Sequence, residues 1–377
     1  MKKTITLLFF IFLFLSIDSV KGQNFLKRYI SGLVNDTTDI SKPRFIVYPT
    51  IAYSPETSLE IGFSSLYVYY SKRDTTNRLS EISAFTFFTL ENQYGILLDH
   101  AMYSHEDKYF FLGKIKLQSF PLLYYGIGAN TPKEYQARVD ANQIWIKERV
   151  LRKLRKNLFL GLEFDFQRLS QVDFIKNDEF ESIEFPLGYQ GFTNFGIGTG
   201  IVYDNRHNVL NVRNGFFSEL GFLHYSPVFS DFEFNTLFSD TRIYRPIGKQ
   251  NVFAAQLLGQ FNTGNVPFNQ LALMGGETIM RGYYTGRFRD NNQIAAQTEF
   301  RFLPLPLGFS KRIGATVFGS VATVFPTVRE ISMKNLVWAG GAGFRFLLFP
   351  KKDIYTRIDY SFTREGGGLY IFIGEAF

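Results

Sequence analysis

Regular alternation of apolar and polar residues is the sequence feature that most constrains the fold of this chain. Over residues 158–166, every even-numbered position is apolar, and Glu163 and Asp165 lie between them. A helix would distribute these charges around its circumference, whereas a strand places them on one face. The pattern therefore predicts a β-strand with one apolar face and one charged face.

The same alternation recurs in two later segments. Residues 294–302 place Glu299 and Arg301 on the polar face, and residues 354–362 do the same for Arg357 and Asp359. An apolar outer face with a polar interior is typical of barrels that cross the bacterial outer membrane. The sequence thus predicts an all-β, antiparallel transmembrane β-barrel.

Counting such segments predicts about sixteen strands within one barrel domain, residues 44–377. Short and long connections alternate, as two rims of a barrel require, and the long ones lie near 120–141, 171–193 and 263–292. An even count places both chain ends in the periplasm. The predicted strands begin near Phe45, Leu59, Leu79, Tyr94, Lys108, Asn142, Asn157, Asn194, Asn214, Phe234, Gln250, Gln293, Arg312, Asn335, Asp353 and Gly367.

Composition supports the same class. Aromatic residues make up 18% of the chain, with 43 Phe and 21 Tyr, which suits the apolar band and aromatic girdles of a membrane barrel. The formal net charge is +7, but Lys and Arg are scattered through turns and strands without a basic cluster. Contacts with lipopolysaccharide phosphates, or a lumen lined by basic side chains, explain these charges better than nucleic-acid binding does.

The first 22 residues predict a secretory signal peptide. Lys2 and Lys3 precede an apolar run over residues 5–15, and cleavage is expected before Gln23. Residues 23–43 then form a short periplasmic segment. The chain has no cysteine, and its four histidines have no metal-ligand spacing, so we expect neither a metal site nor a cofactor. Export and barrel pattern together predict the outer membrane of a Gram-negative bacterium.

A long polar connection, residues 263–292, contains Met280, Arg281, Gly282 and Tyr283 in sequence. Compact domains rarely keep a loop of this length without a function. Because strands flank it on both sides, we expect it to fold back into the barrel as a lid or plug.

Three motifs together resemble the bacterial surface antigen family, which includes BamA, TamA and the two-partner secretion transporters. Residues 280–283 resemble the family's Val-Arg-Gly-Tyr/Phe lid motif, and residues 203–208 with 213–215 resemble its Asp-x-Arg-Asp turn. Residues 372–377 resemble its closing strand with a final aromatic residue. The resemblance spans residues 44–377 and implies a lid-containing barrel that inserts or translocates outer-membrane proteins.

The resemblance also implies partners for the lid arginine. Glu299 matches one acidic residue of the inner wall, whereas Ser320 stands where the family usually has aspartate. We therefore expect a lid that is held less firmly. Residues 23–43 are too short for the family's periplasmic POTRA modules, which implies a variant that lacks them.

The first and last strands are expected to form a weak seam. Pro49 removes a backbone donor from the first strand, and Gly374 offers no side chain to pack in the last one. The alternative is that Pro49 lies at the rim, where it has no cost. Phe377 is expected to be an assembly signal read by the barrel-insertion machinery, with simple packing as the alternative.

An enzyme is not expected. His224 and Ser226 share one face of a strand, but Pro227 follows and no third group can be assigned to orient the histidine. Asp204 and Arg206 are expected to stabilise a periplasmic turn.

The sequence thus predicts a monomeric, non-enzymatic barrel that aids outer-membrane protein assembly or translocation. Its expected partners are outer-membrane lipids and either nascent outer-membrane proteins or envelope complex subunits. The alternative function is a passive or plugged pore, or a structural scaffold, without insertase activity.

Overall fold

The structure is a computed structural model that describes residues 39–54, 58–90, 93–119, 121–180 and 182–377. The predicted signal peptide, and all but the end of the segment 23–43, lie outside the described residues.

Sixteen long strands make up the barrel in the described part of the chain, and three short strands accompany them. The short strands are β6 (Leu122–Tyr124), β13 (Ala272–Met274) and β14 (Phe288–Asp290). The long strands are β1 (Arg44–Ser54), β2 (Ser58–Tyr70), β3 (Leu79–Thr89), β4 (Tyr94–Tyr103), β5 (Tyr109–Ser119), β7 (Ala137–Arg155), β8 (Leu158–Lys176), β9 (Phe192–Asp204), β10 (Gly215–Tyr225), β11 (Phe234–Ile247), β12 (Asn251–Gly264), β15 (Asn292–Phe302), β16 (Ile313–Phe325), β17 (Val337–Phe349), β18 (Ile354–Thr363) and β19 (Gly366–Ile373).

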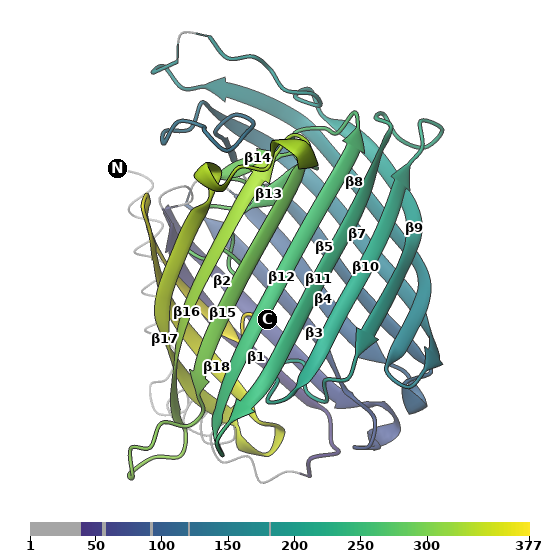
Figure 1. Cartoon of the computed structure of the whole chain (residues 1–377), viewed down its shortest axis with the longest axis vertical. Coiled ribbons are helices and arrows are strands. Elements are labelled where there is room, and N and C mark those ends of the chain that lie inside the picture. The colour runs from purple at the N-terminus through teal and green to yellow at the C-terminus, as the bar shows by residue number, and fades with distance from the viewer. Residues whose placement is uncertain (1–38, 55–57, 91–92, 120, 181) are drawn as a thin grey trace, which may run out of the picture.

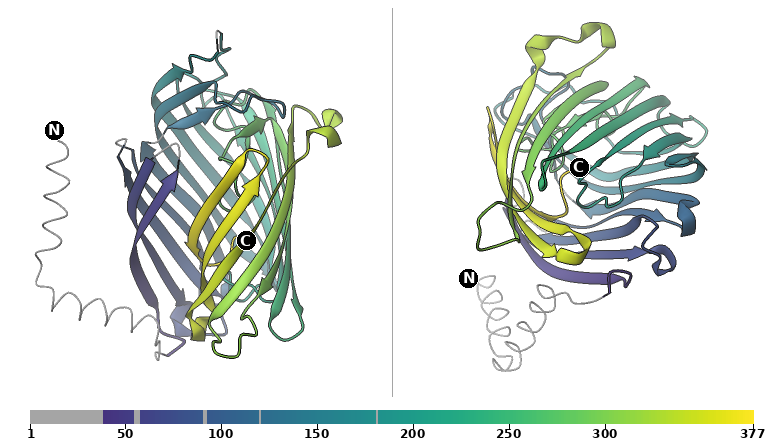
Figure 2. Two further views of the ribbon diagram at one scale, coloured as in Figure 1. Left: turned by 90° about the vertical axis from the view of Figure 1, so that its left-hand side faces the viewer. Right: turned by 60° about the horizontal axis from the view of Figure 1, so that its bottom comes forward.

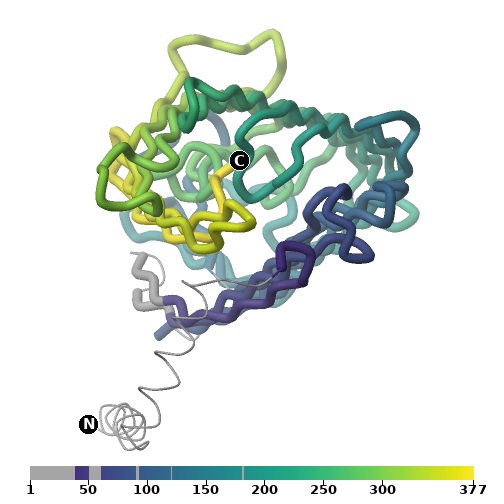
Figure 3. Tube along the Cα trace, turned by 90° about the horizontal axis from the view of Figure 1, so that it is seen from below, coloured from purple at the N-terminus to yellow at the C-terminus, as the bar shows by residue number. Residues whose placement is uncertain are grey.

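Each long strand pairs antiparallel with the next one along the chain, from β1 through to β19. The tilted strands wrap around a central lumen, as Figure 1 shows from the side and Figure 3 shows from below. The predicted all-β antiparallel barrel is therefore confirmed. No helix within the described ranges has the length and apolarity needed to cross a membrane.

The two faces of the strands differ as their alternation predicts. On β8, Leu162 is 53% exposed on the outer wall, whereas the adjacent Glu163 is 1% exposed and faces the lumen. On β18, Tyr360 is exposed and Asp359 is fully buried. Apolar side chains thus cover the outside of the barrel, and charged ones line its interior.

The connections sort onto two rims. Brief turns such as 248–250 and the 3-10 turn η5 (Pro350–Lys352) lie on one rim, and the segments 120–136, 177–191, 265–291 and 326–336 lie on the other. Strands β7 and β8 have 19 residues each and extend beyond the long-loop rim. The longest connections thus share one rim, as predicted, but the alternation is not strict, because 205–214 and 303–312 have ten residues each on the other rim and 364–365 is a short turn on the long-loop rim.

Two segments of the chain occupy the lumen. The connection 265–291, called the lid below, carries the hairpin β13–β14 and folds into the barrel from the long-loop rim. At the C-terminus, residues 374–377, called the tail below, leave β19 and turn inward (Figures 1 and 3). Both segments approach the inner face of the strands that end the sheet.

Candidate functional site

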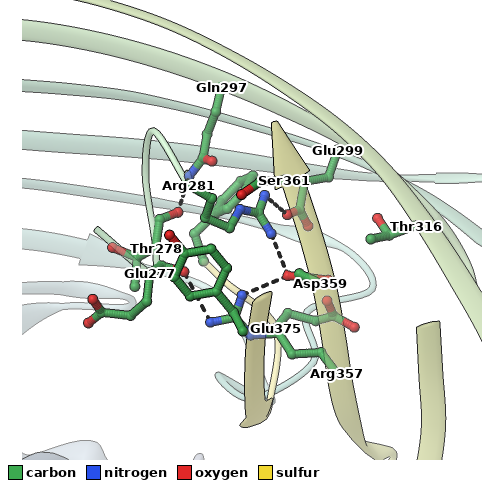
Figure 4. Close-up of polar contacts among 12 residues, drawn as sticks. Glu277, Thr278, Arg281, Gln297, Glu299, Thr316, Arg357, Asp359, Ser361 and Glu375 are labelled. Atoms are coloured by element: carbon green, nitrogen blue, oxygen red, sulfur yellow. Dashed lines mark hydrogen bonds and ion pairs between the residues drawn. The ribbon is translucent and has the colours of Figure 1, made fainter. Parts of the chain in front are cut away.

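The lid presents one arginine to the barrel wall. Arg281 is 1% exposed, and its guanidinium pairs with Glu299 on β15 and, at 2.7 Å, with Asp359 on β18 (Figure 4). The same guanidinium lies 3.5 Å above the centroid of the Phe318 ring on β16. Charge pairing and the aromatic face together compensate for its removal from water. Arg281 thus connects the lid to three wall strands.

The two carboxylates that hold Arg281 belong to a larger charge network. Glu299 also accepts from Arg301 at 2.7 Å, and Asp359 also accepts from Arg345 at 2.6 Å. From the tail, Glu375 lies 2.9 Å from Arg345 and 3.7 Å from Arg301. The contacts close into a ring of alternating sign, the charge ring, which consists of Arg281, Glu299, Arg301, Glu375, Arg345 and Asp359.

Burial makes the charge ring sensitive to the loss of any member. Each of its six side chains is at most 1% exposed, so its charge is compensated by its neighbours in the ring and, for Asp359, also by Arg357 of β18 at 2.8 Å. Removing one partner from a buried ion pair leaves the other charge without compensation, which is strongly destabilising. The ring therefore couples the lid, strands β15, β17 and β18, and the tail.

Gly282 allows the lid backbone to touch the wall. It has a φ of +103°, and a Cβ atom at this position would lie 2.7 Å from Cγ2 of Thr363. Its N–H donates to the hydroxyl of Tyr370 on β19 over 2.9 Å. Any other residue would be strained in this conformation and would collide with β18. Glycine at this position of the lid motif therefore has a steric reason.

The next lid residue, Tyr283, is an apolar anchor. It is buried and packs its ring edge-on against Phe288 of β14, with 5.7 Å between ring centroids. Met274 and Met280 of the lid join the same cluster, together with Ala322 and neighbouring residues of the wall. The Arg-Gly-Tyr motif thus combines an ionic contact, a close backbone approach and an apolar anchor.

The far end of the lid is also tied down. Arg287 pairs at 2.5 Å with Glu365 in the β18–β19 turn, and donates at 2.7 Å to the hydroxyl of Thr131. Arg289 donates at 2.8 Å to the carbonyl of Leu123, and burial lowers the pKa of its guanidinium to about 10. The lid therefore bridges the last hairpin and the connection 120–136.

The structure brings only part of the predicted site together. Glu299 contacts Arg281 as expected, but Ser320 does not, because its hydroxyl is directed at the carbonyl of Ala339 at 3.5 Å. Asp359 supplies the second carboxylate instead. Sequence reasoning placed Asp359 on the inward face of its strand without assigning it to the lid. The expected shortage of acidic partners is therefore not found.

No backbone ladder joins the first and last strands in the described residues. The ladder that each of them forms there is with its neighbour along the chain, β1 with β2 and β19 with β18. The two terminal hairpins lie on the same side of the barrel (Figure 2, left). Pro49 is exposed, pairs with Phe63 and lies in the middle of β1 rather than at the rim. The seam between β1 and β19 therefore stays a candidate functional site.

The predicted closing strand through Phe377 needs correction. Strand β19 ends at Ile373, and Gly374 follows with a φ of +90° while its N–H donates to the carbonyl of Tyr355 at 2.8 Å. Gly374 therefore turns the chain out of the sheet rather than weakening the last strand. Phe377 is buried in the lumen, and its carbonyl accepts from Arg301 at 3.0 Å. Its role as an assembly signal stays a prediction.

The candidates for catalysis lie elsewhere. His224 Nδ1 is 2.8 Å from Asn235 Oδ1, a contact between neighbouring strands that the sequence did not reveal, while the Ser226 hydroxyl accepts from the N–H of Val228 at 3.3 Å. Asp204 and Arg206 form a buried pair at the start of the turn 205–214. Within the described ranges, no group of three or more His, Asp or Glu side chains has an arrangement suited to a metal ion.

Comparisons with known proteins agree with this architecture. The model of the Omp85 superfamily domain matches residues 103–346. The crystal structure of Haemophilus ducreyi BamA lacking POTRA domains 1-3 is similar, with a TM-score of 0.53 and 15% identity, over 88% of this chain and 69% of that one.

More distant likenesses include two Pseudomonas aeruginosa proteins. OccK10 (OpdN) has a TM-score of 0.32 and 9% identity, over 88% of this chain and 96% of its own. OpdQ has a TM-score of 0.33 and 8% identity, over 88% and 97%. No curated protein matches the chain significantly. The family match covers more than half of the chain and confirms the resemblance seen in its motifs. This chain therefore belongs to the Omp85 superfamily of outer-membrane β-barrel proteins.

Proposed function

We propose that this chain assists the insertion or translocation of outer-membrane proteins in a Gram-negative outer membrane, without catalytic chemistry of its own. One observation carries the proposal: the lid binds the last hairpin, whereas no backbone ladder joins that hairpin to β1 in the described residues. Arg281 contacts β18, Gly282 contacts β19 and Arg287 contacts the turn between them. The lid thus supports the strands that border the seam.

The physical basis is the demand for backbone hydrogen bonds inside a bilayer. An open strand edge exposes N–H and C=O groups that hydrocarbon cannot satisfy. An incoming strand of a nascent barrel protein can satisfy them by adding to the edge. In this mechanism the lid keeps β18 and β19 in position while the seam between β1 and β19 separates. Outer-membrane lipids and nascent barrel proteins are the proposed partners.

A passive or plugged barrel is the competing proposal. Chain segments occupy the lumen from both sides, with the lid above and the tail below, and the charge ring connects them. Such an arrangement also suits a closed pore or a scaffold for other envelope proteins. A functional assay of the seam distinguishes the two proposals.

The test uses the absence of cysteine from the chain. Val47→Cys in β1 is combined with cysteines placed one at a time over residues 369–373 of β19, and the protein is reconstituted into liposomes. A small barrel protein is added unfolded, and its folding is followed by heat-modifiable gel mobility. We expect the reduced protein to accelerate folding, and a cross-linked seam to abolish the acceleration reversibly.

A matched control comes from the same edge of the sheet. Val47→Cys with Ser65→Cys joins residues that face each other directly in the β1–β2 pair, so this cross-link should leave the acceleration intact. Equal acceleration with the seam closed would rule out the seam mechanism. No acceleration by the reduced protein would favour the passive barrel.

A further inference from the structure

One connection on the long-loop rim points away from the barrel. The segment 326–336 between β16 and β17, yellow-green in Figure 2, extends sideways beyond the outer wall, and Figure 3 shows the same from below. The lid and the connection 120–136 are bonded to each other, because the Gly128 N–H donates to the carbonyl of Arg289 in the lid at 2.8 Å. Asn130 of that connection also donates at 3.4 Å to Asn335, near the end of the segment 326–336, so only the remainder of this segment projects freely. The segment 326–336, called the side loop below, therefore lies outside the circumference of the barrel.

Internal hydrogen bonds give the side loop a defined shape. It contains two single-turn 3-10 helices, η3 (Val328–Glu330) and η4 (Met333–Asn335). The hydroxyl of Thr327 donates to the carboxylate of Glu330 at 2.8 Å, and the hydroxyl of Ser332 accepts from the N–H of Lys334 at 3.3 Å. Because these bonds fix the turns, the side loop keeps its side chains projected outward.

The side chains of the side loop are amphipathic. Met333 is 77% exposed and Val328 is 62% exposed, and Ile331 is exposed beside them. Arg329 and Lys334 lie among these apolar residues and are exposed, as is Glu330, the acidic residue of the side loop. Large apolar side chains exposed together on a structured loop mark a binding surface. Apolar residues interleaved with basic ones are typical of segments that bind the interface of an anionic membrane.

The adjoining wall indicates the level of that interface. Trp338, the second residue of β17, is exposed on the outer wall and packs edge-on against Phe362 of β18, with 6.2 Å between ring centroids. Tryptophan on the outside of a membrane barrel is enriched where hydrocarbon gives way to headgroups. The side loop ends immediately before β17 and extends outward from that level, over the area that lipid must occupy.

We propose that the side loop is a membrane anchor that rests on the phosphate-bearing headgroups of the outer leaflet. Val328, Ile331 and Met333 enter the interfacial layer, and Arg329 and Lys334 pair with lipid phosphates. A lipid surface fits better than a protein partner, because the exposed apolar residues continue the apolar outer wall. The anchor lies on the β16–β19 side of the barrel, close to the seam.

The test attaches an environment-sensitive fluorophore at a single position, Met333→Cys, in the otherwise cysteine-free chain. The labelled protein is reconstituted into bilayers that contain phosphatidylglycerol and a lipid carrying a nitroxide at the headgroup. Ile127→Cys is the matched control, because Ile127 is an exposed apolar residue of the long-loop rim in the connection bonded to the lid. We expect several-fold stronger quenching at position 333 than at position 127, and protection of position 333 from aqueous iodide.

Charge reversal tests the phosphate contact separately. Arg329→Glu with Lys334→Glu should reduce the nitroxide quenching at position 333 in phosphatidylglycerol bilayers, and should change it little in purely phosphatidylcholine bilayers. Equal quenching at positions 333 and 127, with full access for iodide, would overturn the anchor and leave a protein partner as the occupant. Nitroxide quenching at position 333 that stays unchanged after the charge reversal in both bilayers would overturn the phosphate contact. Neither result depends on insertase activity, so the proposed function and the anchor can fail independently.

Discussion

Among the buried charge clusters of the described residues, two connect different parts of the molecule. In the wall cluster, Arg149 of β7 pairs with Glu163 of β8 at 2.8 Å and with Glu219 of β10, and Lys147 approaches Glu163 at 2.8 Å. All its members belong to strands that are at most three places apart in the sheet. The charge ring instead joins the lid and the tail to strands β15, β17 and β18.

The same chemistry therefore has two structural consequences. Strands β7 to β10 are already joined by backbone ladders, so the wall cluster adds to the stability of a continuous sheet. In the described residues no strand ladder joins the lid or the tail to the wall, so side chains such as Arg281 and Glu375, together with single backbone bonds such as Gly374 N–H to the carbonyl of Tyr355, hold them in place. Breaking the charge ring should move a segment, whereas breaking the wall cluster should weaken the barrel.

Arg281→Ala should have the largest effect. It removes the charged hydrogen bonds to Glu299 and Asp359, worth about 1.5–3 kcal/mol each, and the contact with the Phe318 ring, while Arg301, Arg345 and Arg357 still compensate the two carboxylates. Because the barrel strands stay paired, the variant should weaken the docking of the lid and leave the free energy of barrel unfolding nearly unchanged. Single-channel recording should show larger or noisier conductance, with little change in the thermal unfolding midpoint.

An exposed arginine of the adjoining hairpin turn provides the control for this variant. The Arg364 side chain is 52% exposed and lies 3.8 Å from Glu365, so Arg364→Ala should leave the conductance as in the natural chain. Unchanged traces for Arg281→Ala would show that the charge ring does not hold the lid.

Arg149→Ala should have the next largest effect, and it should be of the opposite kind. It removes charged hydrogen bonds to Glu163 and Glu219, at a cost of about 2–3 kcal/mol of barrel stability, while Lys147 still compensates Glu163. Heat-modifiable gel mobility should show a lower unfolding temperature, and conductance should stay unchanged. Arg138→Ala, which breaks a half-exposed pair on the same strand, should change neither. A conductance increase for Arg149→Ala would remove the distinction between the clusters.

Much of this comparison could be predicted from sequence alternation, because a period of two fixes which face each side chain occupies. Glu163, Glu299 and Asp359 were all assigned to the lumen on that basis. Alternation does not show which inward residues meet across the barrel. Arg281 and Asp359 are 78 positions apart, and their contact depends on how the lid folds back against β18. For the same reason, the sequence did not show that Asp359 supplies the second carboxylate to Arg281, which Ser320 cannot supply.

The tail was mispredicted for a different reason. An aromatic final residue after a run of alternating residues is typical of a closing strand, and the pattern contains no sign of a turn except Gly374. A glycine in a strand pattern can indicate a bulge, a close approach or a positive φ. In the structure Gly374 has a positive φ, and the contacts of Glu375 with Arg345 and of Phe377 with Arg301 hold the tail in the lumen. Both are long-range contacts that a local pattern does not encode.

Gly282→Ala should displace the lid less than Arg281→Ala does. The added Cβ would lie 2.7 Å from Thr363, and the positive φ would be strained, at a combined cost on the order of 1–2 kcal/mol. Limited proteolysis within the lid should become faster, and conductance should rise slightly. Gly286→Ala also has a positive φ but faces the Arg289 side chain rather than the wall. Equal proteolysis of the two variants would mean that contact with β18 is unimportant.

Tyr370→Phe should have the smallest effect, and it sharpens the comparison most directly. It removes only the hydroxyl that accepts from the Gly282 N–H, a single neutral hydrogen bond worth about 1 kcal/mol. If the lid supports the seam through β19, Tyr370→Phe and Gly282→Ala act on the same contact. The double variant should then increase lid proteolysis by less than the sum of the increases in the two single variants. Lid proteolysis rates of the single and double variants provide the measurement. Full additivity would show that the lid and β19 are energetically independent, and that the charge ring alone positions the lid.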